Sequence, residues 1–224
     1  MSEILNFFPL SIFKDTIKTS EKNKQIMIDE ILKMEESSKN ESNEKAKTWT
    51  GDTRGHEFLF KNKNFELLFI DIGNKIKEYI ESLSLNSSEL NFYFQRAWAT
   101  VTKNQGNIKP HRHNQSHISF AYYLSLPKDS GAIVFLDDDP ANQIAPGLFR
   151  SKLVRKPSLL NAPEVTIEAK ENDIIIFPSK TRHTTKSNQT NKIRISISAD
   201  IVITLKNSKS YERLMPDFSI LKRF

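Results

Sequence analysis

The stretch LNFYFQRAWATV (90–101) marks the point at which the chain changes from a helical to an extended pattern. Before it, in residues 64–84, apolar side chains recur every three or four positions, which predicts a helix. Within it, apolar and polar residues alternate in the way that is typical of a strand. The even-numbered residues are therefore expected on one face of that strand: Leu90, Phe92, Phe94, Arg96, Trp98 and Thr100.

More strand-like segments follow this one: HISFAYYLSL (117–126), GAIVFLD (131–137), DIIIFPS (173–179) and KIRISISADIVITL (192–205). Short strands at regular spacing are typical of a barrel or of a double-sheet jelly roll. A segment rich in proline, alanine and asparagine, 138–164, interrupts the strands. Its length and its position between strands make it a candidate substrate-gating loop.

These patterns predict a single, mainly β domain with helices at its N-terminal end. We expect three regions along the 224 residues: a helical region over 1–89, a β core over 90–206 and a C-terminal tail over 207–224. Within the helical region, residues 22–36 have apolar residues at helical spacing, and residues 37–57 are polar enough to predict a loop.

Composition limits the kinds of chemistry and the kinds of partner. The chain has no cysteine, so any metal must be held by nitrogen and oxygen ligands, which suit iron, manganese and zinc. The net charge of +6 permits a nucleic-acid partner, but lysine is spread along the whole chain, which favours non-specific basicity. No apolar run is long enough to span a bilayer, and the first residues lack a signal-peptide pattern. We therefore expect a cytoplasmic protein that does not interact with a membrane.

Three of the five histidines cluster just before a predicted strand, at His111, His113 and His117. On an extended segment His111 and His113 share a face, so both imidazoles can reach one ion. The pair alone is a weak signal, because solvated surface histidines are common. A further histidine, His183, follows the apolar run DIIIFPS. The sequence thus contains a candidate set of imidazole ligands on separate segments.

The segment KIRISIS adds a cationic residue at a position of interest. Three isoleucines alternate there with Arg194, Ser196 and Ser198. If the polar face points into a barrel, the buried guanidinium requires an anion, and a carboxylate suits its two parallel N–H groups. The alternative is that this face is the solvated outside of an edge strand.

Taken together, HRHNQSHISFAYYLSL (111–126), GAIVFLDDDP (131–140), FPSKTRH (177–183) and KIRISIS (192–198) resemble the 2-oxoglutarate/iron(II)-dependent oxygenases, distant relatives of the prolyl hydroxylases. The resemblance covers roughly residues 90–205. It implies a double-stranded β-helix, a cupin-like jelly roll, with Fe(II) at its open end. It also implies a dioxygenase that uses 2-oxoglutarate as cosubstrate, hydroxylates an unidentified substrate, and releases succinate and CO2.

The resemblance also implies roles for individual residues. The metal ligands would be His111, His113 and His183. The remote carboxylate of 2-oxoglutarate would be bound by Arg194, Tyr123 and Ser196. Tyr123 shares its parity with Ser119 and Ala121, which is consistent with one inward face. The pocket for the substrate would include Arg96, Trp98 and His117. No catalytic side chain is implied beyond the metal site.

His113 departs from the pattern, because many relatives carry an aspartate at this position. A histidine there gives three neutral ligands where the usual site has two histidines and one carboxylate. Whether His111 and His113 both bind the metal stays open, and one of them would otherwise support the other. The acids at 137–139 are a candidate replacement carboxylate, although a solvated turn is the favoured interpretation of that run.

Other classes of protein compete with this interpretation. One is a cupin-like three-histidine metal enzyme that does not use 2-oxoglutarate. Another is a non-catalytic metal-binding β-barrel protein. A third is an oxygenase that acts on a nucleic-acid base, which the positive charge permits. Arg194 and Tyr123 distinguish the 2-oxoglutarate-dependent class from the first of these alternatives, because a three-histidine enzyme of that kind has no need to bind a dicarboxylate.

Overall fold

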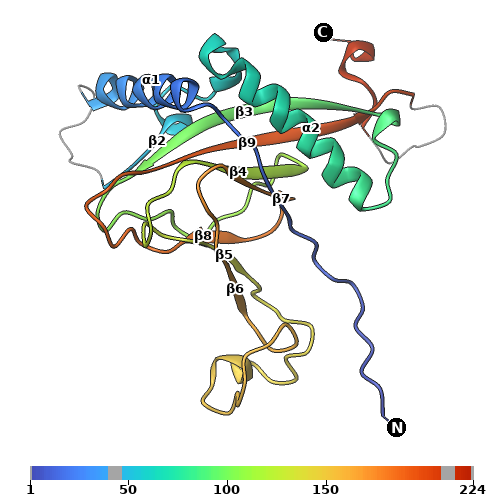
Figure 1. Cartoon of the computed structure of the whole chain (residues 1–224). Helices are drawn as coiled ribbons and strands as arrows, with labels where there is room; N and C mark the ends of the chain where they lie inside the picture. Colours follow the sequence, from blue (N-terminus) through green and yellow to red (C-terminus); the bar gives the residue numbers. More distant parts are fainter. Residues whose placement is uncertain (1, 40–46, 208–214, 223–224) are drawn as a thin grey trace.

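The computed structural model describes residues 2–39, 47–207 and 215–222. Two helices, α1 (Glu21–Lys39) and α2 (Glu66–Ser82), lie on one side of a larger sheet (Figure 1). That sheet has the strand order β1-β7-β4-β9-β3-β2, and a smaller sheet has the order β6-β5-β8. Every pair of neighbouring strands in both sheets is antiparallel.

The larger sheet consists of β1 (Phe13–Thr16), β7 (Asp173–Pro178), β4 (Ile118–Ser125), β9 (Arg194–Leu205), β3 (Leu90–Thr102) and β2 (Thr48–Thr50). The smaller sheet consists of β6 (Glu164–Ile167), β5 (Ile133–Leu136) and β8 (His183–Thr185). Short 3-10 turns lie between these elements: Gly51–Thr53, Leu59–Lys61, Lys63–Phe65, Ser87–Glu89, Leu148–Arg150 and Phe218–Ile220. The mixed α/β architecture with antiparallel sheets agrees with the predicted fold class, but the region 1–89 is not purely helical, because it contributes the outer strands β1 and β2 to the larger sheet.

Strand alternation decides what each face of the larger sheet contacts. Ile195 and Ile197 of β9 and Phe120 of β4 point toward the helices and join the main apolar core. The buried stripe of α2 completes this core: Leu68, Phe69, Ile72, Ile76, Tyr79 and Ile80. The opposite face contributes Tyr123 and Phe177 to a second apolar cluster, with Ile133 and Phe135 of the smaller sheet. Along each strand of the larger sheet, the residues that alternate with the core residues therefore face the space between the two sheets.

The expectation that the even-numbered residues of β3 share one face is wrong. The register between β3 and β9 shifts between Phe94 and Arg96, as at a β-bulge. Phe92 and Phe94 pack on the helix side, whereas Trp98 and Thr100 line a cavity on the other side. An extra residue in one strand reverses the alternation beyond it, and periodicity alone does not reveal it.

The expected loop over 37–57 is also corrected in part. Residues 37–39 belong to α1, residues 48–50 form the edge strand β2, and residues 51–53 form a 3-10 turn. Residue 47 and residues 54–57 are irregular, as expected, and residues 40–46 lie outside the described residues. Polar composition does not prevent β2 from forming, because its backbone pairs with β3 while Trp49 alone is buried.

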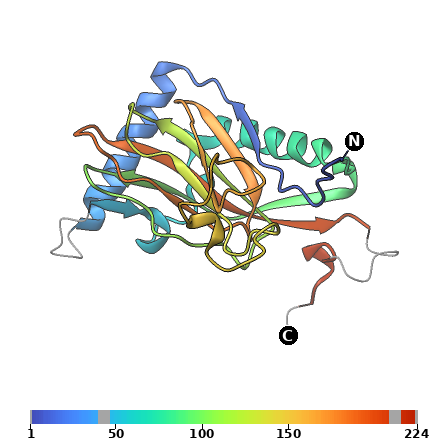
Figure 2. The ribbon, with the colours of Figure 1, turned by 90° about the horizontal axis from the view of Figure 1, so that it is seen from below.

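The remaining regions frame the two sheets. Most of the segment 138–164 is irregular, and it extends away from the sheets between β5 and β6 (Figures 1 and 2). Of the expected tail over 207–224, residues 208–214 and 223–224 lie outside the described part. Phe218 of this tail packs on Tyr93 with 4.8 Å between ring centroids. None of the helices in the described residues is both long and apolar enough to cross a bilayer.

Candidate active site

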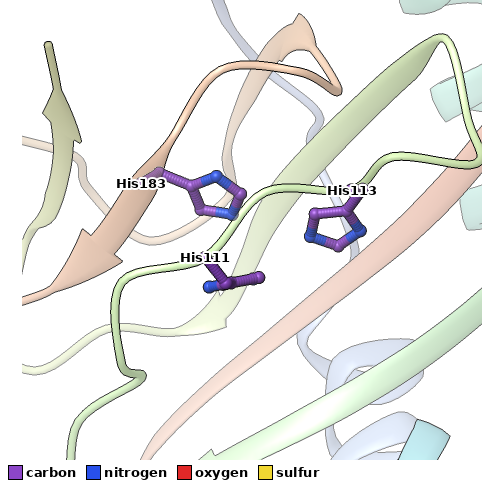
Figure 3. A group of neighbouring side chains, drawn as sticks. All are labelled: His111, His113 and His183. Atoms are coloured by element: carbon purple, nitrogen blue, oxygen red, sulfur yellow. The ribbon is translucent and has the colours of Figure 1, made fainter. Parts of the chain in front are cut away.

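Three histidines come together at one end of the space between the sheets (Figure 3). His183 begins β8, and its backbone forms an isolated antiparallel bridge with His111, in the segment before β4. Each of these two backbones donates to the other at 2.9 Å, and the His113 N–H donates to the carbonyl of Ser179 at 3.0 Å. One ring nitrogen from each histidine lies within 4.8 Å of the other two.

Hydrogen bonds fix which nitrogen of each ring is free. Nδ1 of His111 lies 2.9 Å from the carbonyl of Lys109, and Nδ1 of His183 lies 2.9 Å from the carbonyl of Thr181. Nδ1 of His113 lies 2.5 Å from a carboxylate oxygen of Asp200. Carbonyl and carboxylate oxygens only accept, so each Nδ1 carries a proton, and in the neutral ring each Nε2 keeps its lone pair. This arrangement fits a divalent metal, because ligating histidines usually donate their other N–H to such groups.

Burial keeps two of the rings neutral. It lowers the pKa of His183 to about 3, with smaller contributions from the neighbouring histidines. Burial likewise lowers the pKa of His111 below its usual range. Protons therefore do not compete for these two rings near neutral pH, and the rings are ready to bind an ion. Three imidazole nitrogens suit iron, zinc and copper.

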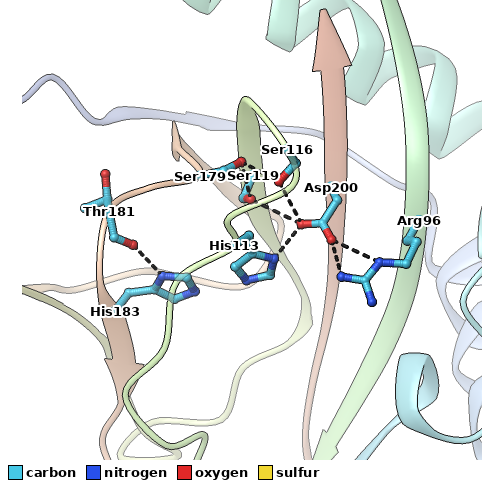
Figure 4. A network of polar contacts seen from close by, with 8 residues as sticks. All are labelled: Arg96, His113, Ser116, Ser119, Ser179, Thr181, His183 and Asp200. Carbon is cyan, nitrogen blue, oxygen red and sulfur yellow. Dashed lines mark hydrogen bonds and ion pairs between the residues drawn. The ribbon is translucent and has the colours of Figure 1, made fainter.

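Asp200 also belongs to this site, although the sequence patterns did not single it out. It lies on β9, it is 2% exposed, and its Oδ1 accepts the bond from His113 (Figure 4). Its Oδ2 accepts from Nε and Nη2 of Arg96, at 3.1 and 2.5 Å. Burial alone would raise the pKa of Asp200, but the bonds from His113 and Arg96 outweigh it and keep this pKa below its usual range. The same alternation that points Arg194, Ser196 and Ser198 inward also reaches residue 200, so parity could have found it.

Arg194 is a buried cation without a carboxylate. It is 1% exposed, and its guanidinium donates to the carbonyl of Gly131 at 2.8 Å and to two threonine hydroxyls. Among the described residues, no acidic side chain pairs with it, and its Nε has no partner. Burying a charge without a partner costs on the order of several kcal/mol, because the ion loses its hydration and no opposite charge offsets that loss. This position is therefore built for an anion that the protein itself does not supply.

The histidines and Arg194 line one cavity of about 500 Å³. Tyr123 and Ser196 also line it, so the predicted cosubstrate residues and the three predicted metal ligands share one space. Ser119 and Ala121 lie on the same side as Tyr123, as their parity predicted. Apolar walls come from Ile108, Ile133 and Phe177, and a polar edge comes from Thr50, Asp52 and Thr53.

Not every predicted pocket residue lines this cavity. Trp98 does, and its ring stacks on His113 with 5.7 Å between centroids. Arg96 does not: it reaches Asp200 behind His113. His117 does not either, and its Nδ1 accepts from the Ile203 N–H at 3.0 Å. The acids at 137–139 are not part of the histidine group. Asp138 instead forms ion pairs with Arg112 and Arg182.

The site thus combines antiparallel sheets with three histidines and a buried arginine. This combination can be compared with known families. Residues 96–200 match the family model described as "Putative 2OG-Fe(II) oxygenase". The matched segment contains the three histidines and Arg194, and the match agrees with the sequence resemblance. No curated protein matches the chain significantly.

Solved structures share this fold at low sequence identity. The carbocyclase SnoK from nogalamycin biosynthesis, described as non-heme and alpha-ketoglutarate dependent, has a TM-score of 0.57 and 12% identity over 92% of this chain and 87% of its own. HygX from Streptomyces hygroscopicus, with nickel and 2-oxoglutarate bound, has a TM-score of 0.56 and 9% identity over 92% and 91%. A prolyl-4-hydroxylase from Pseudomonas putida has a TM-score of 0.53 and 10% identity over 86% and 92%.

Proposed function

We propose that the protein is a 2-oxoglutarate- and Fe(II)-dependent dioxygenase that hydroxylates a small-molecule or peptide substrate. The observation that carries the proposal is the buried Arg194, which has no carboxylate partner among the described residues and lines the same cavity as the three histidines with their free ring nitrogens. A dicarboxylate that reaches from the metal to Arg194 satisfies both features at once. The two antiparallel sheets around this cavity support the finer assignment of a double-stranded β-helix.

His111, His113 and His183 would hold the iron through their Nε2 atoms, so both members of the His-x-His pair act as ligands. The contacts of all three Nδ1 atoms support this, because each ring already presents its lone pair. Bound iron and 2-oxoglutarate would supply the oxidation, in which 2-oxoglutarate, O2 and a substrate C–H group are converted to succinate, CO2 and a C–OH group.

Arg194 would pair with the remote carboxylate of 2-oxoglutarate, using the Nε–H for which the described part of the chain offers no partner. Tyr123 would donate its phenolic proton to the same carboxylate. Burial raises the pKa of Tyr123 to about 12, although the nearby Arg194 lowers it, so the phenol remains a donor at neutral pH. Ser196 lines the same wall and supplies a further hydroxyl.

The remaining walls suit the substrate and the exclusion of water. Phe177 is 1% exposed and Ile133 is 2% exposed, and both line the cavity beside Arg194. Their apolar surfaces keep water from the cosubstrate and strengthen the charge pairing there. Thr50, Asp52 and Trp98 line the part of the cavity formed by β2, the turn after it and β3. We assign that part to the substrate.

The experiment that tests the proposal compares wild type with Arg194→Gln. Calorimetry of the Mn(II)-loaded protein should give 2-oxoglutarate binding that weakens by about 10- to 100-fold in the variant, because a charge-assisted pair is lost. Mn(II) affinity itself should stay within about threefold, because Arg194 is not a ligand. Unchanged 2-oxoglutarate affinity in a folded variant would contradict the proposal. It would favour a cupin-like three-histidine enzyme that uses no 2-oxoglutarate.

A further inference from the structure

The ligand set of this site carries no negative charge. Three neutral imidazoles face the position of the metal, whereas the common arrangement for non-haem iron(II) is two histidines and one carboxylate. A divalent ion in a partly buried site is stabilised by nearby negative charge. A compensating carboxylate should therefore lie just behind one of the ligands.

Asp200 occupies such a position. Its Oδ1 lies 2.5 Å from Nδ1 of His113, on the side of the ring opposite the free Nε2. Ser116 and Ser119 also reach this oxygen, at 3.3 and 3.5 Å, and Ser179 bonds both serines at 2.8 Å (Figure 4). The carboxylate is thus fixed from several directions and aimed at one ligand.

Two further contacts restrict the His113 ring. The ring stacks on Trp98 with an interplanar angle of 15°. Arg96 binds only Oδ2 of Asp200, and its guanidinium lies 5.3 Å from the Trp98 ring. Arg96 therefore orients the carboxylate without taking the oxygen that faces His113. Because the Arg96 side chain is 43% exposed, solvent screens its charge more than that of Asp200, which is 2% exposed.

We propose that Asp200 is the displaced carboxylate of this metal centre: through His113 it supplies the negative charge that the three ligands lack and fixes the ring that binds the metal. The inference rests on the proposed metal site. Asp200 is a positioning residue, because it touches His113 rather than the metal. A carboxylate behind a ligating histidine fixes its tautomer and raises its basicity.

The first test measures Co(II) affinity of the metal-free protein by visible absorption. Asp200→Asn keeps the shape of the side chain and a hydrogen-bond acceptor but removes the charge. It should weaken Co(II) binding by about 10- to 100-fold. Asp173→Asn is the matched control, because Asp173 is a buried carboxylate on β7 that pairs with Lys14 and lines no part of the cavity. It should leave Co(II) affinity unchanged.

A second pair of variants gives a result of opposite sign. His113→Asp places a carboxylate ligand beside Asp200, so two negative charges face each other. In that background Asp200→Asn should strengthen Co(II) binding, whereas in the wild-type background it weakens binding. A purely structural role for the Arg96–Asp200 pair predicts the same direction in both backgrounds. Equal Co(II) affinity of wild type and a folded Asp200→Asn overturns the inference.

A measurement on the wild-type protein tests the inference even if the variants fail to fold. Long-range ¹H–¹⁵N correlation spectra of the Zn(II)-loaded protein should show the proton of His113 on Nδ1 and the metal on Nε2. A proton on Nε2 of His113 overturns the inference while the metal is still bound. Failure of the wild type to bind Co(II) or Zn(II) instead overturns the proposed function itself, so the two failures are distinguishable.

Discussion

His111 and His183, 72 positions apart in the sequence, pair as an isolated antiparallel bridge in which each backbone N–H donates to the carbonyl of the other at 2.9 Å. This backbone pairing sets their rings 4.3 Å apart. Side-chain bonds to Lys109 and Thr181 then fix the orientation of each ring. Backbone and side-chain hydrogen bonds within the protein thus orient two of the three ligands.

Because the scaffold itself holds these rings, the metal-free protein should be folded and should gain stability from the metal by mass action. At about 100 times the Kd, a metal that binds only the native state adds roughly 2.7 kcal/mol. His183→Ala should remove this gain, so that Co(II) no longer raises the Tm measured by calorimetry. His117→Ala is the control, since His117 lies outside the cavity. A Co(II)-dependent rise in Tm that survives in His183→Ala would contradict the assignment of this ligand.

Gly131 positions Arg194, and its replacement should disturb the cosubstrate pocket. Its φ is +102°, and an added Cβ would lie 2.2 Å from the carbonyl oxygen of Lys186 and 2.9 Å from Nη1 of Arg194. Gly131→Ala should therefore lower the free energy of unfolding by about 1–3 kcal/mol or more. It should also weaken 2-oxoglutarate binding.

Gly147→Ala is the matched control for that change. Gly147 also has a positive φ, +76°, but an added Cβ would meet nothing within 4 Å. Denaturant unfolding should show only the backbone strain of about 1–2 kcal/mol. Calorimetry should give wild-type 2-oxoglutarate affinity. Equal 2-oxoglutarate affinities in the two variants would show that Gly131 has no part in placing Arg194.

Tyr123 should titrate well above an ordinary tyrosine. Burial raises its pKa to about 12, so the phenol is still protonated where an exposed tyrosine is largely ionised. A titration of tyrosinate absorbance should therefore give superimposable curves for wild type and Tyr123→Phe up to about pH 11. An extra tyrosinate in wild type near the ordinary pKa would mean that Tyr123 is solvated and does not face a closed pocket.

Much of the architecture could be predicted because it depends on long periodic segments. The alternation in KIRISIS correctly separated Ile195 and Ile197 from Arg194 and Ser196. The apolar stripe of residues 64–84 likewise gave α2. The short strands β1, β2, β6 and β8 lack a continuous apolar run like the IVFL of β5, and they form because partner strands satisfy their backbones.

Two features of the site escaped prediction for physical reasons. The bulge in β3 between Phe94 and Arg96 reverses which residues face the cavity, and it leaves no periodic signal. Alternation along β9 places Asp200 on the same face as Arg194, but only the pairing of β4 with β9 brings residue 200 opposite Ser119 and next to His113. Neighbouring strands, rather than neighbouring residues, assemble the site.

The most direct test of the central claim mixes the anaerobic protein with Fe(II) and 2-oxoglutarate, and then admits O2. We predict a visible charge-transfer band before O2 is added, and succinate above the level given by His183→Ala after it is added. Absence of the band, with succinate no higher than in that variant, would contradict the assignment of this protein as a 2-oxoglutarate-dependent oxygenase.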